Sequence, residues 1–394
     1  MEGTKKKSLF GRIVKAILLI ILAIIVIAAA AVWITWHNEI KTVASIEQLA
    51  PKDEAHKDGA TYSIHVYGDY YFEDFLKQGG SPSVDGTISY LVKNITKGLF
   101  DLSLSDPAAG CTCFTAATED GDRIMGRNYD FRSTNTAIVF TDAKGDRHAT
   151  VSSVDLQFIS VKPESDLTPI LNKVLCLAAP YVPMDGMNDA GVSCGILMSY
   201  QEGSTQQNTD KPDLIASAMV RLVLDYADDL DEAIELIKQY DMHDTLGTSF
   251  HYFIADASGR SATLEYLCNG GCTRDTDDPD SRELVITYSD GDKSNVVTNF
   301  IIDPGYYSDD ADKHGLDRYE IVKEQLEASG SVVKDVQAGM GLLDTVSRRD
   351  FKQSDGNGLT VHSVVYNLTD RTVMWVGNEH FGEEAYTFTY DLSK

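Results

Sequence analysis

Two cysteines stand at the head of a strand-like segment in the chain. The segment reads AGCTCFTAATEDGDRIMGRNYDF, in which Cys111 follows Gly110, and Arg127 and Asp130 come after a turn. A cysteine can act as a nucleophile without a histidine partner when its own α-amino group serves as the base, because that amine has a pKa near ~8 and the thiol one near ~8.5. Such a base requires a free amino terminus.

Cys111 is internal, so the peptide bond from Gly110 must be cut before this chemistry can operate. A glycine at that position lets the thiol approach the preceding carbonyl with little steric obstruction. We therefore expect Cys111 to cleave its own chain at Gly110-Cys111, which would release a precursor segment and expose the new amino terminus.

At this point the sequence resembles a known family. From Cys111 onward, and not from Cys113, CTCFTAATEDGDRIMGRNYD reproduces without a gap its pattern of a cysteine, a strand, an Asp-Gly turn and G-R-N-x-D. Further matches are DGMNDAG at 185–191, VTN at 297–299, LDRY at 316–319 and the ending TVHSVVYNLTDRTVMWV. The family is the choloylglycine hydrolase, or linear-amide C–N hydrolase, group of N-terminal nucleophile hydrolases, which includes bile-acid hydrolases and penicillin V acylases. The resemblance covers about residues 111–376.

The resemblance implies roles for five residues. Cys111 would supply both the thiolate and the amine, and Arg127 would lie beside the sulfur, where it favours the thiolate and orients the substrate. Asp130 would hold the ammonium form of the amine. Asn299 would help to bind the oxyanion, and Arg318 would complete the charge network.

One position departs from the pattern of bile-acid hydrolases. Where they carry an asparagine at the end of a strand, this chain has Met198 in GILMSY. A methionine side chain cannot donate a hydrogen bond, so only the backbone N–H of Met198 could contribute to an oxyanion site. The departure puts bile-salt specificity in doubt more than catalysis.

The remaining cysteines do not suggest a metal site. Cys176 and Cys194 lie in apolar runs and are expected to be buried hydrophobic residues. Cys268 and Cys272 could form a disulfide, but their spacing is not a zinc pattern, and neither CxxC…CxxC nor HExxH occurs. We expect no metal and no cofactor.

The amino-terminal sequence predicts export. Residues 1–15 form a basic tail, and residues 16–36, AILLIILAIIVIAAAAVWITW, would make a helix of roughly 31 Å, close to the ~30 Å core of a bilayer. The positive charges precede this stretch, which favours a cytoplasmic amino terminus and an extracellular catalytic domain. A cleaved signal peptide is the alternative, although its apolar region is usually shorter, about 7–15 residues.

The rest of the chain is strongly acidic. The total charge is −26, and the first 37 residues contribute five cations and one glutamate, so the remainder carries −30. Such a surface argues against nucleic acid as a partner and favours solubility. The expected partners are a small-molecule N-acyl amide and, through residues 16–36, the lipid bilayer; the sequence leaves the oligomeric state open.

Several elements can be placed by periodicity. Residues 37–110 are expected to form a connector and pro-segment, with a polar stretch over 37–61, a strand over 62–71 and a helix over about 85–100. Strands then alternate with paired helices near 212–240, which favours an α+β chain. The resemblance makes this more specific: a four-layer αββα N-terminal nucleophile hydrolase domain over residues 111–394.

The predicted function is therefore hydrolysis of a linear amide outside the cytoplasm. Two alternatives remain open: an acyltransferase of the same family, and a non-catalytic anchored scaffold or binding protein on the same fold. A papain-type protease is disfavoured because nothing resembles its C-G-S-C-W neighbourhood. The sequence does not reveal which acyl group or amine is preferred.

Overall fold

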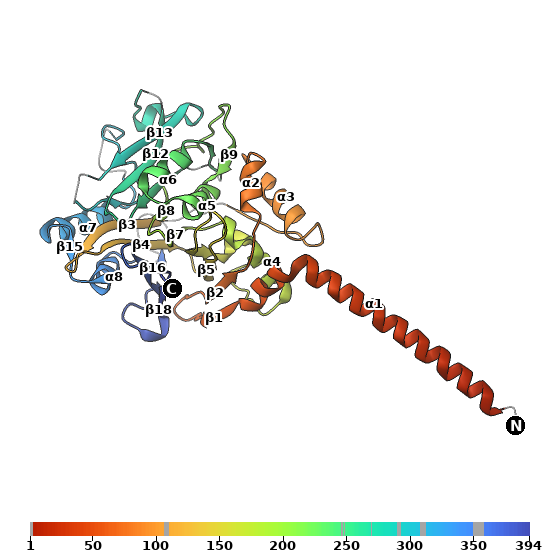
Figure 1. The fold of residues 1–394 in the computed structure, drawn as a ribbon. Coiled ribbons are helices and arrows are strands. Elements are labelled where there is room, and N and C mark those ends of the chain that lie inside the picture. The colour runs from red at the N-terminus through yellow and green to blue at the C-terminus, as the bar shows by residue number, and fades with distance from the viewer. Residues whose placement is uncertain are drawn as a thin grey trace.

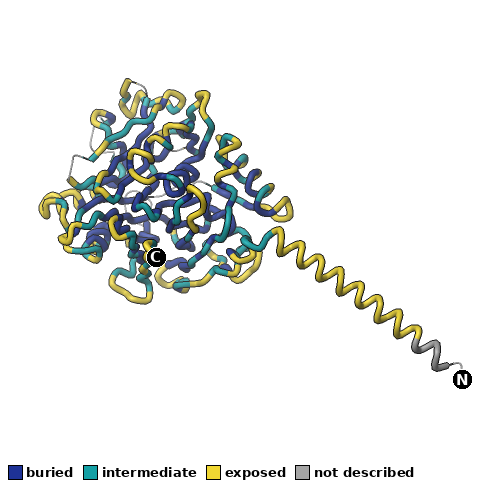
Figure 2. The backbone as a smooth tube through the Cα atoms, viewed as in Figure 1, coloured by how far each residue is buried: buried dark blue, intermediate teal, exposed yellow. Residues whose placement is uncertain are grey.

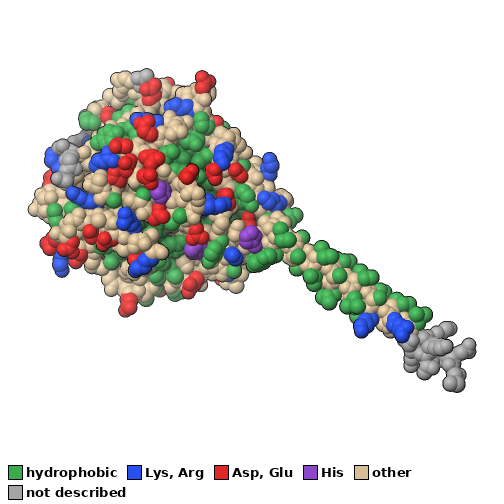
Figure 3. Space-filling view, in the orientation of Figure 1, with side chains coloured by type: hydrophobic (Ala, Val, Ile, Leu, Met, Phe, Trp, Pro, Cys, Tyr) green, Lys and Arg blue, Asp and Glu red, His purple; other side chains and the backbone are tan. Residues whose placement is uncertain are grey.

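The computed structural model describes residues 3–105, 110–245, 247, 249–268, 270–289, 293–307, 313–349 and 358–394, with side chains from 9 onward. A long helix, α1 (Gly3–Ser45), projects from a globular body that contains the other elements, as Figure 1 shows. Figure 3 shows acidic side chains spread over one face of the body, and apolar ones along the helix.

Helix α1 is exposed over most of its length (Figure 2). From residue 9 to 45 it is long and apolar enough to cross a membrane, with a mean hydropathy of 3.3 in its most apolar part. A signal sequence can have the same length and apolar character, so the helix fits both the membrane anchor and the cleaved signal peptide. Trp36 departs from helical geometry (φ −131°, ψ 25°), which places a kink where the predicted span ends.

One large sheet forms the first layer of strands. Its order is β1-β2-β5-β6-β7-β8-β11-β12-β13, and neighbours pair antiparallel except β2 and β5, which are parallel. The strands are β1 (Glu47–Ala50), β2 (Thr61–Val66), β5 (Thr136–Thr141), β6 (Thr150–Asp155), β7 (Asp185–Asn188), β8 (Ser193–Met198), β11 (Phe250–Ala255), β12 (Ser261–Cys268) and β13 (Arg282–Tyr288).

A second sheet holds the predicted nucleophile. Its order is β14-β3-β4-β16-β17-β18, and β15 also pairs with β3. The strands are β3 (Gly110–Thr118), β4 (Arg123–Phe131), β14 (Val296–Val297), β15 (Val332–Val333), β16 (Leu359–Asn367), β17 (Thr372–Gly377) and β18 (Thr387–Asp391). A separate parallel pair consists of β9 (Asp213–Ile215) and β10 (Asp241–His243).

Helices cover the outer faces of both sheets. The first sheet is covered by α2 (Phe72–Lys77), α3 (Val84–Asn94), α4 (Ile170–Leu175), α5 (Ala216–Tyr226) and α6 (Leu230–Ile237), and the second by α7 (Leu316–Ala328) and α8 (Val336–Thr345). Short 3₁₀ turns occur at Leu156–Ile159, Cys176–Tyr181, Arg274–Thr276, Pro279–Ser281 and Glu384–Tyr386.

The alternation of side chains along β3 explains how the layers pack. Cys111 and Cys113 point into the apolar layer between the two sheets, whereas Phe114 and Ala116 belong to the cluster under α7 and α8. Successive side chains of a strand face opposite sides of the sheet. The odd-numbered side chains at 111 and 113 therefore face the layer between the sheets, and the even-numbered ones at 114 and 116 face the helices α7 and α8. The predicted four-layer αββα fold is therefore confirmed.

Local signals account for the boundaries. The turn between β3 and β4 contains Gly121 at φ 94°, whose N–H donates to the carbonyl of Thr118 at 3.0 Å, as the Asp-Gly pair predicts. Helix α3 ends at Asn94, earlier than predicted, because Lys97 and Gly98 adopt positive φ and the N–H of Gly98 donates back to the carbonyl of Val92 at 2.9 Å.

The segment before Cys111 is part of the globular body. Residues 37–105 contribute the end of α1, β1, β2, α2 and α3, so the stretch predicted as a polar connector is helical at its start and joins the first sheet. Residues 106–109, next to the predicted cleavage point, lie outside the described residues. The division of the chain at residue 111 stays a prediction.

Candidate active site

Cys111 lies in the space between the two sheets. It is the second residue of β3, its side chain is 1% exposed, and its Sγ accepts a hydrogen bond from Nη2 of Arg127 at 3.1 Å. The thiol also lies 3.8 Å from the carbonyl oxygen of Ile196 on β8, to which it can donate. The predicted nucleophile and arginine are therefore in contact.

Arg127 is anchored by the opposite sheet. On β4 it pairs in register with Cys113, so its side chain enters the interlayer space next to Cys111. Its guanidinium donates to Asp185 Oδ2 at 2.5 Å, to the Ile196 carbonyl at 2.6 Å and to the carbonyl of Met184. These contacts link β4 to β7 and β8 and aim one guanidinium nitrogen at the sulfur.

Asp185 is a fully buried carboxylate. Besides Arg127, it accepts a hydrogen bond from the Tyr366 hydroxyl at 2.5 Å and lies 3.1 Å from Nε2 of His362. Burial acts to raise the pKa of Asp185, but the charge of Arg127 and the contact with His362 outweigh it and hold the pKa well below its usual range. Asp185 is therefore ionised and balances the charge of Arg127.

The thiol itself is neutral in the intact chain. Burial raises the pKa of Cys111, and the nearby Arg127 only partly offsets that effect. Arg127 acts to lower the pKa of the thiol, the direction that the family resemblance implies, but burial has the larger effect. A base close to the sulfur is consequently required for nucleophilic attack.

Asn299 and Arg318 hold the backbone of Cys111. Asn299 Oδ1 accepts a hydrogen bond from the Cys111 N–H at 2.7 Å, and Arg318 Nη2 donates to the same oxygen at 2.9 Å. Arg318 Nη1 also donates to the Cys111 carbonyl and, at 2.7 Å, to the Thr112 hydroxyl. Arg318 lies in the first turn of α7, as the LDRY motif predicts for a helix start.

Asp130 completes the cluster from β4. It lies opposite Gly110 in the β3–β4 register, which places it beside the predicted cleavage point. Its carboxylate accepts a hydrogen bond from the Thr360 hydroxyl at 2.7 Å and forms an ion pair with Arg318 at 3.4 Å. In the described contacts its cationic neighbour is thus Arg318, and the carboxylate partner of Arg127 is Asp185.

Met198 reaches the cluster through its backbone. It ends β8, and its carbonyl oxygen accepts a hydrogen bond from Asn299 Nδ2 at 2.8 Å. The amide predicted to bind an oxyanion is therefore held next to the backbone of Met198. The contribution of the Met198 N–H to an oxyanion site stays a prediction.

Sequence reasoning missed the support around Arg127. In the sequence Asp185 is simply the first residue of the DGMNDAG motif, and His362 and Tyr366 belong to the ending TVHSVVYNLTDRTVMWV. A buried arginine requires a carboxylate partner, so the signal was available. Asp130, only three residues away, was the obvious acidic neighbour, and pairing between sheets cannot be read from sequence spacing.

Asn188 forms the turn within the DGMNDAG motif. Its side-chain oxygen accepts from the N–H groups of Ala190 and Val192, at 3.2 and 2.9 Å, and its amide donates to the carbonyl of Ala227. Its side chain thus fixes the β7–β8 turn and, through that turn, the position of Asp185.

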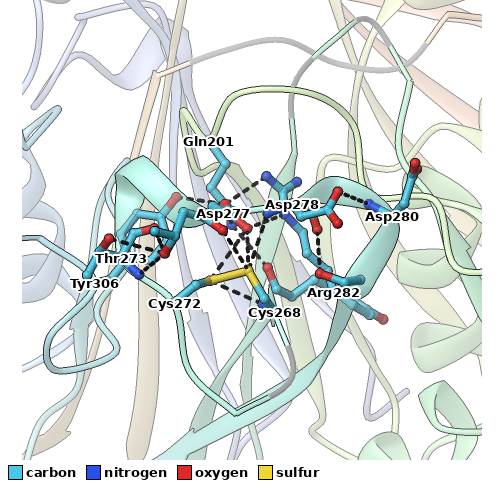
Figure 4. The surroundings of a disulfide bond; sticks show 12 residues. Gln201, Cys268, Cys272, Thr273, Asp277, Asp278, Asp280, Arg282 and Tyr306 are labelled. Carbon is cyan, nitrogen blue, oxygen red and sulfur yellow. Dashed lines mark hydrogen bonds and ion pairs between the residues drawn. A yellow bond between two sulfur atoms is a disulfide. The ribbon is translucent and has the colours of Figure 1, made fainter.

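The other cysteines lie apart from this chemistry. Cys176 and Cys194 are free and buried, as predicted, and burial raises the pKa of both thiols. Cys268 and Cys272 form a disulfide, one of the outcomes that the sequence left open (Figure 4). Beside the disulfide, Asp277 accepts hydrogen bonds from the guanidinium of Arg282 at 3.0 and 2.7 Å.

Two groups of side chains within the described residues have the composition of a metal site: Cys268, Cys272 and Asp277, whose two sulfurs are joined in the disulfide, and a group on the loop between β1 and β2. Asp53, His56 and Asp58 bring their ligand atoms close together on the loop between β1 and β2. Ion pairs at 2.8 Å between His56 and Asp53, and between His380 and Asp58, account for this cluster without an ion. It is remote in sequence from the residues around Cys111.

The family model described as linear amide C–N hydrolases, choloylglycine hydrolase family, matches residues 111–270. The match starts at Cys111 and confirms the resemblance seen in the motifs. Over these residues the chain is therefore similar to the linear amide C–N hydrolase family. No curated protein sequence matches the chain.

Solved structures of low similarity include a mutant of conjugated bile acid hydrolase from Clostridium perfringens, with 15% identity, a TM-score of 0.48 and coverage of 72% of this chain and 94% of that chain. Penicillin V acylase from Agrobacterium tumefaciens has 17% identity, a TM-score of 0.48 and coverage of 72% and 87%. An N-acylethanolamine-hydrolyzing acid amidase ortholog from Caenorhabditis elegans has 16% identity, a TM-score of 0.40 and coverage of 66% and 93%. At such low identities and TM-scores, the substrates of these proteins cannot be assigned to this chain.

Proposed function

We propose that this protein is a membrane-anchored, extracytoplasmic hydrolase of linear amides whose nucleophile, Cys111, becomes amino-terminal by self-cleavage. One observation carries the proposal: both atoms of Cys111 that the chemistry needs are already held. Its sulfur lies 3.1 Å from Arg127 Nη2, and its backbone nitrogen donates to Asn299 Oδ1 at 2.7 Å.

Self-cleavage would begin with attack of the Cys111 sulfur on the carbonyl carbon of Gly110. The thiol proton passes to the backbone nitrogen of Cys111 as the carbon–nitrogen bond breaks, and the upstream chain is left as a thioester on the sulfur. Water then hydrolyses the thioester, which leaves a carboxylate on Gly110 and a free thiol on Cys111. Asp130, which lies opposite Gly110 in the register, would hold the new ammonium group.

Amide hydrolysis would use the same sulfur and the new amine. The amine accepts the thiol proton, the thiolate attacks the substrate carbonyl, and the ammonium returns the proton to the leaving amine. Water then releases the acyl group from the thioester. Asn299 Nδ2, with the Met198 N–H, would bind the oxyanion; loss of such a donor typically costs about 10²–10³ in rate.

The location is supported by two features. Helix α1 has the length and apolar character of a membrane span, and basic residues precede it. The disulfide between Cys268 and Cys272 is of the kind that persists in oxidising compartments. Together they favour a cytoplasmic amino terminus and a body outside the cytoplasm.

The decisive experiment follows the chain length of two matched variants. The parent should separate on a denaturing gel into a fragment ending at Gly110 and a larger one beginning with Cys111, and mass spectrometry should identify that new end. Cys111→Ala should remain whole and inactive. Cys113→Ala, on the same strand and facing the same layer, should still be cut and active.

Two results would contradict the proposal. If Cys111→Ala is cut as efficiently as the parent, another protease does the processing. If Cys111→Ala hydrolyses amides at the parental rate, the assigned nucleophile is wrong.

Substrate class and topology need their own assays. Conjugated bile acids, phenoxyacyl penicillin, N-acyl amino acids and N-acylethanolamines should be offered to the purified full chain in mild detergent; release of free amine from at least one is expected, and none at all would favour a scaffold.

Protease added outside intact cells should digest the acidic body and spare an epitope at Met1. Protection of the body would overturn the orientation.

A further inference from the structure

An apolar pocket lies at the neck where α1 meets the globular body. We call it the neck pocket; its volume is about 650 Å³, within the range of ligand-binding pockets. One side is a single face of α1, and the other is the loop after α3 together with α4 and the turn that follows it. The lining residues are Val32, Trp36, Glu39, Ile40, Val43, Ala44, Ile95, Thr96, Leu99, Phe100, Ile170, Lys173, Val174 and Leu177.

The rim of this pocket is unusually apolar for a protein surface. Leu99, Phe100, Ile170 and Leu171 are 64%, 48%, 63% and 62% exposed. Among the described residues outside α1, the other exposed large apolar side chains are Tyr288 (55%), Ile321 (40%) and Val332 (37%), one on each of three separate elements. Exposed apolar residues that are scattered singly are normal on a protein surface, whereas a contiguous apolar patch marks an interaction site. The four clustered side chains beside the open pocket therefore indicate a contact surface.

The position of the neck pocket identifies what the surface would contact. Val32 and Trp36 belong both to the pocket lining and to the last turns of the predicted span. Trp36 marks the kink of α1, and its indole N–H donates to the carbonyl of Ile95 at 2.9 Å, which fastens the body to the end of the span. A tryptophan at that point is typical of the membrane interface.

Charges near the rim fit a phospholipid surface. Lys173 lines the pocket, and the exposed Lys97 has its ammonium 4.7 Å from the centre of the Tyr71 ring on the same neck. Lysines beside an apolar rim can reach the phosphates while the rim enters the acyl region. Their presence here is notable because the chain beyond residue 37 carries a charge of −30.

We propose that the neck pocket takes up an acyl chain of a phospholipid in the outer leaflet and that its rim seats the globular body on the membrane. The proposal rests on the membrane anchor of the proposed function and extends it: the body would lie on the bilayer in one fixed pose, rather than moving freely on the end of a helix. It assigns the lipid surface a second contact, outside residues 16–36.

Depth-dependent quenching tests the seating of the rim. Single cysteines at Leu171 and at Leu99 carry a fluorescent label in the full chain with Cys111→Ala, in vesicles of phosphatidylcholine with spin-labelled acyl chains; selective labelling is feasible because the other described free cysteines are all buried. Both labels should lose most of their fluorescence. Ile321→Cys, an exposed apolar position on α7, is the matched control and should keep it.

A label at Val26 separates the two proposals. If Val26→Cys is not quenched, the anchor itself is wrong. If Val26→Cys is quenched while the labels at Leu99 and Leu171 behave like the one at Ile321, the anchor stands and the seating proposal is wrong.

Acyl-chain binding in the pocket is tested by photo-crosslinking. A phosphatidylcholine with a diazirine on one acyl chain should label peptides from 95–100 and 170–177, as well as α1. Ala44→Phe places a ring in the pocket and should reduce labelling of the two body peptides several-fold, whereas Ala328→Phe, at the exposed end of α7, should not. Labelling confined to α1, or a chemically crosslinked dimer through the rim without lipid labelling, would overturn the proposal.

Discussion

Cutting the chain between Gly110 and Cys111 should leave its two fragments associated. Strand β2, upstream of the cut, pairs in parallel with β5, downstream of it, from Thr61 opposite Thr136 to Val66 opposite Thr141. Helices α2 and α3 pack on the same core. The upstream fragment is therefore an edge and a cover of the first sheet, and the anchor would hold the catalytic fragment on the membrane.

The burial of apolar side chains sets the magnitude. Those that the upstream fragment contributes to the core are Tyr62, Ile64, Val66, Tyr70, Phe72, Phe75, Tyr90, Leu91, Ile95, Leu102 and Leu104. At about 1.5–3 kcal/mol for each buried side chain, the gross gain is roughly 16–33 kcal/mol. Association costs about 4–15 kcal/mol in lost translation and rotation. The gain therefore exceeds this cost throughout the two ranges.

The assay is a wash of membranes with alkaline carbonate, followed by size-exclusion chromatography in mild detergent. Both fragments should stay in the membrane and then elute together. Ile64→Asp, which puts a charge into the core, should release the catalytic fragment, whereas Ser63→Asp, at a half-exposed position on the same strand, should not. Release of the parental catalytic fragment into the wash would refute the reasoning.

This prediction can be separated from self-cleavage. Replacing 106–109 by the recognition site of a specific protease in a Cys111→Ala background produces the same cut by an external agent. The fragments should again remain together, because the pairing of β2 with β5 and the shared core do not involve the sulfur of Cys111.

Three more changes test the electrostatics and the disulfide. Asp185→Asn leaves Arg127 buried without its carboxylate partner and should lower the free energy of unfolding by about 3–5 kcal/mol, measured by thermal or denaturant unfolding; an unchanged midpoint would contradict the ion pair. Burial, aided by Asp58, raises the pKa of Glu379 to about 7. The folded state then holds this proton more tightly than the unfolded one, so stability should fall as pH rises from about 4.5 to about 7; Glu379→Gln should lessen that fall in unfolding curves at pH 5 and 8, and identical curves would contradict it. Reducing the disulfide between Cys268 and Cys272, which closes a short loop, should lower the free energy of unfolding by up to about 2 kcal/mol, and a much larger loss would show that it holds more than that loop.

Those parts of the site that depend on local geometry could be predicted from the sequence, because short motifs mark them. The Asp-Gly turn between β3 and β4 predicts a hairpin, and a hairpin places Cys111 and Arg127 on neighbouring strands. The DGMNDAG motif at 185–191 likewise marks the turn between β7 and β8, which the side chain of Asn188 holds. Such features depend on residues close in the chain, which is why spacing alone was sufficient.

Contacts between layers did not follow from sequence. The partner of Arg127 was unforeseen because Asp185 lies on the opposite sheet, where only the packing of two complete sheets brings it within 2.5 Å. The upstream strand β2 was predicted, but not its parallel pairing with β5. Both depend on topology, and a hydrophobic alternation shows that a strand has a buried face without showing what lies against it.

The environment of Cys111 gives self-cleavage a chemical consequence. In the intact chain the nitrogen of Cys111 is an amide and cannot accept the thiol proton, while burial raises the pKa of the thiol. The intact site is therefore poorly suited to attack an external amide. Cleavage would change one group, the amide nitrogen held by Asn299 Oδ1, into an amine beside the sulfur. We therefore expect amidase activity to appear in proportion to the cut fraction, and an uncut chain with Cys111 intact should be inactive.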